Sequence, residues 1–202
     1  MKKILLFAAT LSLSFVAPIK AQDKEFYDQS TYQTVLEPGM YKVGSTLDAG
    51  IYRIISDAEY GMYVISSDAN QEDIIDFSAI TTHSYFEVVD DQYLKLDGTF
   101  AVPMDEVDPI FIEDNTIGPG TYFVGYDIPA GEYEVIQDEE TAMYVIYDSL
   151  DKSEIASMSA ITNNAFVEVE DGQYLQLYGA IITDDALVNE ERPDESINSN
   201  SN

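Results

Sequence analysis

The sequence predicts an all-β protein made of two tandem small antiparallel β-sandwich or partly closed barrel domains, related by an internal repeat. Residues 38–98 return without a gap as residues 119–179, at a constant shift of 81 positions. Of these 61 positions, 28 carry the same residue in both copies, so one structural unit is used twice. Each copy spans about 70 residues and contains about five or six short strand patterns between turn signals, as small sandwiches and barrels do.

Each copy begins with a strand, a turn and a second strand. In the first copy we expect a strand at 40–43, a turn at 47–50 and a return strand at 51–56; in the second, a turn at 128–131 and a return strand at 132–137. Pro129 has a fixed φ, and the glycines that end the two turns, Gly50 and Gly131, can adopt a positive φ. These features favour a tight reversal in both copies.

The middle of each copy is more apolar than its start. The runs 62–65 and 143–147 are apolar on both faces, which indicates strands in the middle of a sheet or between packed layers. The following segment, 74–82, fits either a helical turn or a strand at a sheet edge. Its residues 78–81 are identical to residues 159–162, which suggests that both copies keep them for packing.

Each copy ends on a predicted hairpin. In the first copy, strand patterns at 85–89 and 92–96 flank a turn at 90–91. The corresponding turn of the second copy, at 171–172, is Asp-Gly, a strong signal for a two-residue hairpin. We expect no helix longer than two turns beyond residue 21.

The linker between the copies carries apolar residues 110–112 between acidic ones. Apolar residues favour burial, so we expect a strand or a packed connector here rather than a flexible tether.

The N-terminus has the features of a secretory signal peptide. Lys2 and Lys3 precede the apolar run 4–16, which is too short to span a bilayer, and a cleavage site follows Ala21. The alternative is a buried N-terminal helix. We therefore expect a secreted, extracellular protein, organised as signal peptide 1–21, N-terminal segment 22–35, first β repeat 36–104, linker 105–116, second β repeat 117–186 and disordered acidic and polar tail 187–202.

The charge of the chain makes several partners implausible. With 38 acidic and 9 basic residues the net charge is −29; residues 1–21 hold three of the basic residues and none of the acidic ones, so the remainder carries −32. Nucleic acids and anionic lipids are poor partners, because contacts to phosphate need clustered Lys and Arg. Cations and basic surfaces are the better counterparts. We also expect no membrane insertion and, without cysteine, neither disulfides nor a lipoprotein anchor.

The turn of the second copy has a recognisable pattern. Residues 124–133 read Val-Gly-Tyr-Asp-Ile-Pro-Ala-Gly-Glu-Tyr, and residues 172–177 read Gly-Gln-Tyr-Leu-Gln-Leu. This pattern resembles a motif of secreted and surface proteins of Gram-positive bacteria. In the first copy, residues 43–52 keep the glycines and the tyrosine but lack the Asp-Ile-Pro core. The resemblance covers both repeats and implies an extracellular β module of unknown function; we interpret the motif as a turn scaffold.

Few residues could support catalysis. The chain has no cysteine, and its one histidine, His83, has Asn164 as its equivalent in the second copy. A Ser-His-Asp arrangement would need His83, which we interpret instead as an exposed polar residue near the start of a strand. Acid pairs at 90–91 and 170–171 could serve a glycosidase, but aspartate is also favoured in turns. We predict no catalytic and no cofactor-binding residues.

The segment 68–73 is the best candidate for a metal site. Its Asp, Asn, Glu and Asp side chains offer the oxygen ligands that calcium prefers. The glycine and the closing glutamate of an EF-hand loop are missing, however, and the equivalent segment 149–154 has gained Lys152. We therefore predict an acidic loop and no metal site, with calcium left as a possibility.

The tyrosines fall into two groups. Four pairs recur at equivalent positions: Tyr41 and Tyr122, Tyr52 and Tyr133, Tyr63 and Tyr144, Tyr93 and Tyr174. We expect these shared tyrosines to be core or half-buried packing residues with the hydroxyl at a polar edge, although a ligand-stacking surface is an alternative. Four others occur in one copy only and are better candidates for an aromatic binding face: Tyr60, Tyr126, Tyr147 and Tyr178.

Together these observations favour a secreted, non-enzymatic binding or interaction module whose partner is an unknown protein or an envelope glycan. One alternative is a carbohydrate-binding module of the cell envelope, which unshared tyrosines gathered on one sheet face would favour. A more distant alternative is a carboxylate-dependent hydrolase, which a buried carboxylate pair in a cleft would favour.

Overall fold

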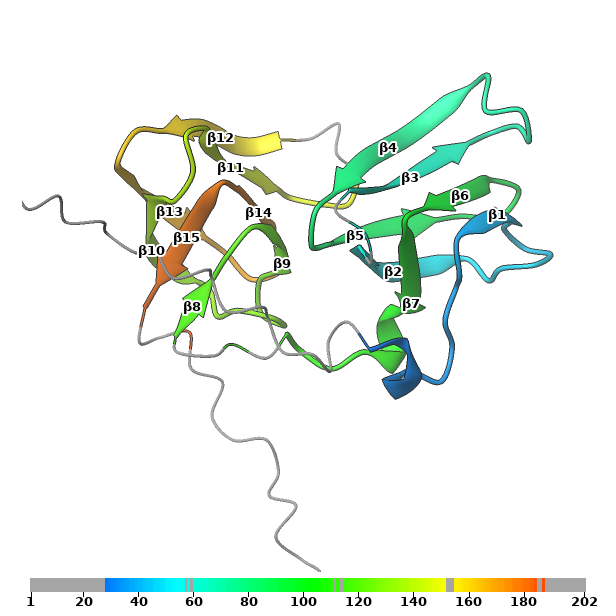
Figure 1. Ribbon diagram of the computed structural model, residues 1–202, viewed down its shortest axis with the longest axis horizontal. Helices are drawn as coiled ribbons and strands as arrows, with labels where there is room; N and C mark the ends of the chain where they lie inside the picture. Colours follow the sequence, from blue (N-terminus) through cyan, green and yellow to red (C-terminus); the bar gives the residue numbers. More distant parts are fainter. Residues whose placement is uncertain are drawn as a thin grey trace, which may run out of the picture.

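The computed structural model describes residues 28–56, 58, 60–110, 112, 115–151, 155–184 and 187. These residues form antiparallel strands and loops, with 3-10 turns such as η1 (Gln29–Thr31) and η2 (Met104–Glu106). Two β-sandwiches lie side by side (Figure 1). The predicted all-β class is confirmed, and the sheets stay open rather than closing into barrels. The predicted signal peptide lies outside the described residues, as does the predicted C-terminal tail apart from Leu187.

The first sandwich consists of two sheets. Its strands are β1 (Gly39–Lys42), β2 (Gly50–Ser56), β3 (Gly61–Ser66), β4 (Ile74–Ile80), β5 (His83–Val88), β6 (Tyr93–Asp97) and β7 (Thr99–Pro103). One sheet has the order β1-β6-β3-β4 and the other the order β5-β2-β7. Leu36 adds an isolated bridge to Ala101 of β7.

The second sandwich has the same topology. Its strands are β8 (Thr116–Ile117), β9 (Gly120–Phe123), β10 (Gly131–Gln137), β11 (Ala142–Tyr147), β12 (Ile155–Ile161), β13 (Asn164–Val169), β14 (Tyr174–Tyr178) and β15 (Ala180–Thr183). The sheet orders are β9-β14-β11-β12 and β13-β10-β15-β8. Strands β9 to β15 follow β1 to β7 at the shift of 81 residues, and β8 takes the place of the Leu36 bridge.

The predicted turns lie where expected, but the hairpins predicted around 90–91 and 171–172 are wrong, because each of these turns leads from one sheet to the other: from β5 to β6 and from β13 to β14. The turns at 47–50 and 128–131 also cross between sheets, from β1 to β2 and from β9 to β10. In the described residues, the consecutive strands that pair within each sandwich are β3 with β4 and β11 with β12. A turn only reverses the direction of the chain. Which strands pair is decided by the packing of the two sheets, whose apolar inner faces are buried against each other in one core.

The predicted strands in the middle of each copy are present. The runs that are apolar on both faces become β3 and β11, each central in its sheet, as predicted. The ambiguous segment 74–82 contains β4, a strand at a sheet edge. Strand β7 and its equivalent β15 were not predicted, so each copy has more strands than expected.

The loop after the first strand of each copy requires a glycine at a position that we did not predict, Gly44 and its equivalent Gly125. Gly44 and Gly125 have φ values of 80° and 87°, and each donates its N–H to a carbonyl three residues later at 2.7 Å. A Cβ at either glycine would lie 2.9 Å from Oδ1 of Asp90 or Asp171, respectively. Of the two turn glycines that we expected to adopt a positive φ, Gly50 does so, at 153°, and Gly131 does not. Gly44 and Gly125, which both copies share, thus allow close packing of this loop.

The shared tyrosines are buried or half-buried, as predicted. The hydroxyls of Tyr41, Tyr52, Tyr122 and Tyr133 each donate a hydrogen bond to the carbonyl four residues earlier, at 2.7, 2.8, 3.1 and 2.7 Å. Their rings therefore pack inside while their hydroxyls hold the preceding loop.

The connector between the sandwiches is packed, as the sequence predicts. Val107 is buried against the first sandwich, together with Phe100 and Val102. Ile110 and Ile112 belong to the core of the second sandwich. The connector is therefore held from both sides.

Candidate functional site

The two sandwiches are docked through a buried polar contact centred on Arg53 of β2. Its guanidinium donates three hydrogen bonds: from Nε to the Tyr85 hydroxyl at 2.8 Å, and from the terminal nitrogens to the Asp108 carbonyl at 2.8 Å and to Oδ1 of Asp127 at 2.9 Å. Tyr85 belongs to the first sandwich, Asp108 to the connector and Asp127 to the second sandwich. One buried side chain therefore joins all three parts.

Asp127 accepts hydrogen bonds through both of its buried carboxylate oxygens. Oδ1 accepts from Arg53 and from the N–H of Ile110 at 3.1 Å, while Oδ2 accepts from the Tyr85 hydroxyl at 2.6 Å and the N–H of Phe123 at 2.8 Å. Burial opposes the charge on Arg53, but Tyr85 and Asp127 outweigh it and raise the pKa of the guanidinium. The pair meets the condition for a stable buried ion pair, because further hydrogen bonds satisfy its remaining polar atoms.

Sequence reasoning did not single out Arg53 or Asp127. The turn-scaffold interpretation of the motif is correct locally, because Asp127 holds its loop as Thr46 does in the first copy, where the Lys42 N–H donates to Thr46 Oγ1 at 2.9 Å. A signal was present in the repeat: Arg53 is equivalent to Glu134, and Asp127 to Thr46. Arg53 occurs only in the first copy and Asp127 only in the second. A contact between the two copies requires such a difference, because each side must carry the charge that the other side lacks.

His83 belongs to the same interface, so the expectation that it is exposed was wrong. The side chain is only 2% exposed, and its ring packs edge-on against Tyr122 with the centroids 4.9 Å apart. Gly120 has a φ of 149°, and a Cβ there would lie 2.3 Å from Cε1 of His83. Burial lowers the pKa of His83 to about 3. The second sandwich covers the start of β5, which local sequence does not reveal.

Aromatic rings and hydroxyls complete the interface. The rings of Tyr85 and Tyr174 lie 5.8 Å apart, and Tyr174 stacks on Phe123 at 4.8 Å. The hydroxyls of Ser84 and Thr121 share a hydrogen bond of 3.0 Å. Strand β5 thus contacts β9 and β14 of the second sandwich.

The surface that docks in the first sandwich is open in the second. Arg53, Tyr85 and His83 lie on the outer face of sheet β5-β2-β7. We call the equivalent outer face of β13 and β10 the acidic face, defined by Glu132, Glu134, Ile136, Asn164, Phe166 and Glu168. Phe166 is 66% exposed, and the Asn164 amide donates to the Glu134 carboxylate.

The outer face of the other sheet shows the reverse: it is docked in the second sandwich and open in the first. In the second sandwich, Thr121, Phe123 and Tyr174 lie on the outer face of sheet β9-β14-β11-β12 and contact the first sandwich. We call the equivalent outer face of β1-β6-β3-β4 the basic face, defined by Met40, Lys42, Met62, Phe77, Tyr93 and Lys95.

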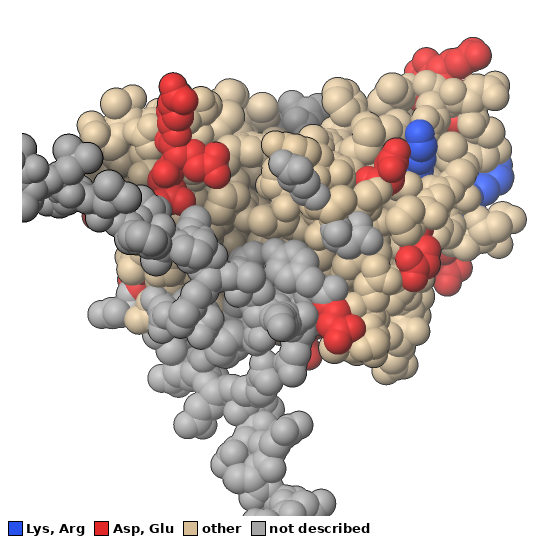
Figure 2. Space-filling model, viewed as in Figure 1, with Lys and Arg blue, Asp and Glu red and all other residues tan. Residues whose placement is uncertain are grey.

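The basic face combines exposed apolar side chains with lysines. Met40 is 46% exposed and Phe77 is 64% exposed. Of the residues that the structure describes, three are Lys or Arg, and the two that reach solvent, Lys42 and Lys95, both lie here. The Lys42 Nζ lies 4.8 Å from the centroid of the Tyr93 ring. Figure 2 shows blue side chains on the right-hand sandwich and red ones over both.

The predicted calcium candidate is used as a cap for its own loop. Asp68 Oδ1 accepts from the N–H of Asn70 at 2.8 Å, and Oδ2 accepts from the N–H groups of Glu72 and Asp73 at 3.0 and 2.9 Å. The hydrogen bond from Asp73 is the main cause of a lowered pKa at Asp68. Within the described ranges, no three Asp, Glu, His or Cys side chains gather in a way that could hold a metal ion.

The unshared tyrosines do not form one binding face. Tyr60 is exposed on the first sandwich, and the Tyr126 hydroxyl donates to the Val107 carbonyl of the connector. Tyr147 and Tyr178 lie on the outer face of the second sandwich, where the Tyr147 hydroxyl donates to the Gln176 side chain at 3.1 Å.

Open grooves on the described surface include the following two. One of about 600 Å³ lies beside the loop at 46–50 and is lined in part by Asp48, Asp105 and Glu106. The other, of about 560 Å³, is lined by Asp76 and Glu87 of the first sandwich and Leu150 of the second, among others. Both contain acidic residues, but no histidine lines either of them.

No protein-family model matches the sequence, and no similar curated protein or solved structure was found. Among the described residues, no helix is long and apolar enough to cross a membrane.

Proposed function

We propose that this protein acts outside the cell as a non-enzymatic interaction module that binds a macromolecular partner through its basic face. The observation that carries this proposal is the combination of exposed Met40, Met62 and Phe77 with Lys42 and Lys95 on one sheet face. Exposed apolar groups that share a face are typical of interaction sites.

The charge of the chain makes the basic face distinctive. On a protein with a net charge of −29, this face is where the described lysines reach solvent. An acidic surface with apolar groups is its natural complement, since opposite potentials steer encounter and fix the register of a contact. Small-molecule sites are usually concave, whereas an open sheet face suits a macromolecule.

The non-enzymatic assignment is supported by the surroundings of the candidate residues. His83 is buried under the second sandwich with a pKa near 3, so it is neutral at neutral pH and shielded from a substrate. Asp68 caps its own loop, and Asp90 and Asp171 pack against loop glycines. The carbohydrate-binding alternative has less support, because the unshared tyrosines are spread over both sandwiches.

Binding is tested by offering the mature chain to two separated envelope fractions, glycan and protein. The central variant is Met62→Ser/Lys95→Glu on the basic face. Its control, Ile155→Ser/Met158→Ser, removes exposed apolar side chains from β12 in the second sandwich. We expect wild type and control to retain an envelope protein that the central variant loses. Retention of glycan alone would favour the alternative, and no loss in the central variant would contradict the proposal.

Export is tested by sequencing the N-terminus of the protein recovered from culture supernatant. We expect it to start near Gln22, after the predicted cleavage site. Recovery of the chain only from cytosol, with residues 1–21 intact, would contradict an extracellular role.

A further inference from the structure

We infer that a second copy of this chain is a partner of the basic face, and that copies join head to tail, with the acidic face of one copy on the basic face of the next. This inference rests on the proposed function, because it names the partner of the same face.

The first argument is that the two free faces are equivalent to surfaces that already meet within the chain. The internal interface joins the outer face of β2 and β5 to the outer face of β9 and β14. At the shift of 81 residues, the acidic face corresponds to the first of these surfaces and the basic face to the second. Another copy could therefore repeat a packing that the fold already uses.

The second argument is charge complementarity. Inside the chain, the base Arg53 lies on the β2 side and the acid Asp127 on the β9 side. On the free faces the signs are exchanged: Glu134 takes the place of Arg53, and Lys42 lies beside Thr46, the equivalent of Asp127. In a repeated contact Glu134 would therefore oppose Lys42, which within one copy lies 3.7 Å from the exposed carboxylate of Asp91.

The third argument comes from the neutral contacts. The internal pair Tyr85 and Tyr174 corresponds to Phe166 and Tyr93, so an aromatic pair is preserved. Phe166 lacks the hydroxyl that Tyr85 donates to Asp127, and the basic face correspondingly has no carboxylate at position 46.

A second neutral pair changes in the same coordinated way. The hydrogen-bonded hydroxyls of Ser84 and Thr121 correspond to Ala165 and Met40, both apolar. In the contact between two copies, both residues of this pair would be apolar, so no hydroxyl would be buried without a hydrogen-bond partner.

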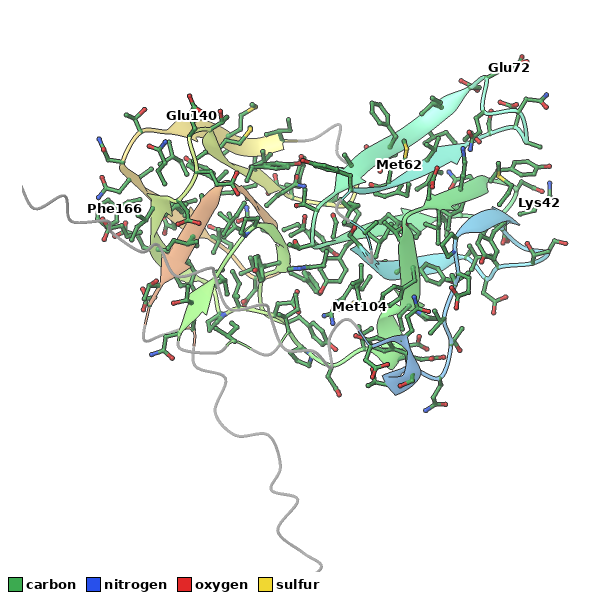
Figure 3. The ribbon with its side chains drawn as sticks, in the orientation of Figure 1. Lys42, Met62, Glu72, Met104, Glu140 and Phe166 are labelled. Carbon is green, nitrogen blue, oxygen red and sulfur yellow. The ribbon has the colours of Figure 1, made fainter. Side chains whose placement is uncertain are left out.

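The positions of the two faces determine the kind of assembly. Phe166 lies at one end of the long axis of the molecule and Lys42 at the other (Figure 3). A contact between two different surfaces is not satisfied by a symmetric dimer, so it adds copies head to tail, in a ring where the rotation between copies closes and in a row where it does not.

The test uses two blocked variants of the mature chain in sedimentation velocity. Met40→Ser/Lys42→Glu blocks the basic face, and Glu134→Lys/Phe166→Ser blocks the acidic face. Glu72→Lys, at an exposed hairpin loop, changes the net charge as Glu134→Lys does and serves as the control (Figure 3). Because the replaced side chains lie on outer faces and are exposed or half-buried, each variant should keep the wild-type circular dichroism spectrum.

The average mass of the wild type and of the control should increase as the protein concentration is raised to about 1 mM. Each blocked variant alone should stay monomeric, whereas an equimolar mixture of the two should form a dimer and nothing larger. A wild type that stays monomeric would overturn the inference, as would association lost in only one blocked variant. If an envelope protein still depends on Met62 and Lys95 in that case, the proposed function stands and only the second copy is rejected.

Discussion

The two sandwiches have the same strand order and the same tyrosine hydrogen bonds, but equivalent outer faces have different neighbours. In the first sandwich, the outer face of β2 and β5 presents Arg53 and Tyr85 and is buried against the second. The equivalent face of the second sandwich presents Glu134 and Phe166 to solvent. Shared tyrosines such as Tyr52 and Tyr133 thus stabilise each sandwich, while Arg53 and Asp127, each found in one copy only, mark surfaces whose neighbours differ.

The difference is sharpest at Asp127. Its equivalent, Thr46, also holds its loop through one backbone N–H, but it has no guanidinium to bind. The same loop therefore has one role in the first copy and two in the second, and matched substitutions can separate them.

The largest expected effect is that of Asp127→Thr, which gives the second copy the residue of the first. It leaves Arg53 buried without its counter-charge, so we expect the free energy of unfolding to fall by about 3–5 kcal/mol. The matched change Thr46→Ala removes two exposed hydrogen bonds, one from the Lys42 N–H and one to the Lys42 carbonyl, and should cost about 1–2 kcal/mol. Urea unfolding followed by circular dichroism measures both, and similar losses would argue against a special role of the Arg53 contact.

Gly120→Ala should have the next largest effect. The new Cβ would lie 2.3 Å from the His83 ring, at a φ of 149° that alanine rarely adopts. We expect a loss of about 2–3 kcal/mol in the free energy of unfolding. The equivalent Gly39→Ala meets its nearest atom at 3.8 Å and should change stability by less than about 1 kcal/mol. Equally mild effects of the two changes would show that the second sandwich does not pack closely on His83.

His83 predicts a pH dependence that its equivalent, Asn164, does not have. Its pKa falls from 6.5 to about 3 on folding, so below pH 6.5 the unfolded chain binds a proton that the folded chain does not. Its contribution is therefore present above pH 6.5 and is lost as the pH falls toward 3, with about 2 kcal/mol gone by pH 5. The difference in unfolding free energy between wild type and His83→Asn should show this slope; a difference independent of pH would contradict the burial of His83.

The smallest effect expected is that of calcium. Asp68 already accepts three backbone N–H groups, and the equivalent segment has Ser149 in place of Asp68, so calcium should stabilise the protein no more than magnesium at equal ionic strength. Both salts should raise the melting temperature by screening the net charge of −29. A rise specific to calcium that Asp68→Ala abolishes would make this loop a metal site after all.

The sequence by itself determined the all-β class, the two equivalent units, the central strands β3 and β11, the packed connector and the packing role of the shared tyrosines. These follow from local patterns, because apolar alternation, turn residues and an internal repeat act over short stretches of chain. Only the tertiary structure decided that the turns at 47–50 and 171–172 cross between sheets and that His83 is buried. It also brought Arg53 and Asp127 together, although they are far apart in the chain. These features depend on which surface packs against which, and that choice is made by the burial and charge of residues far apart in sequence.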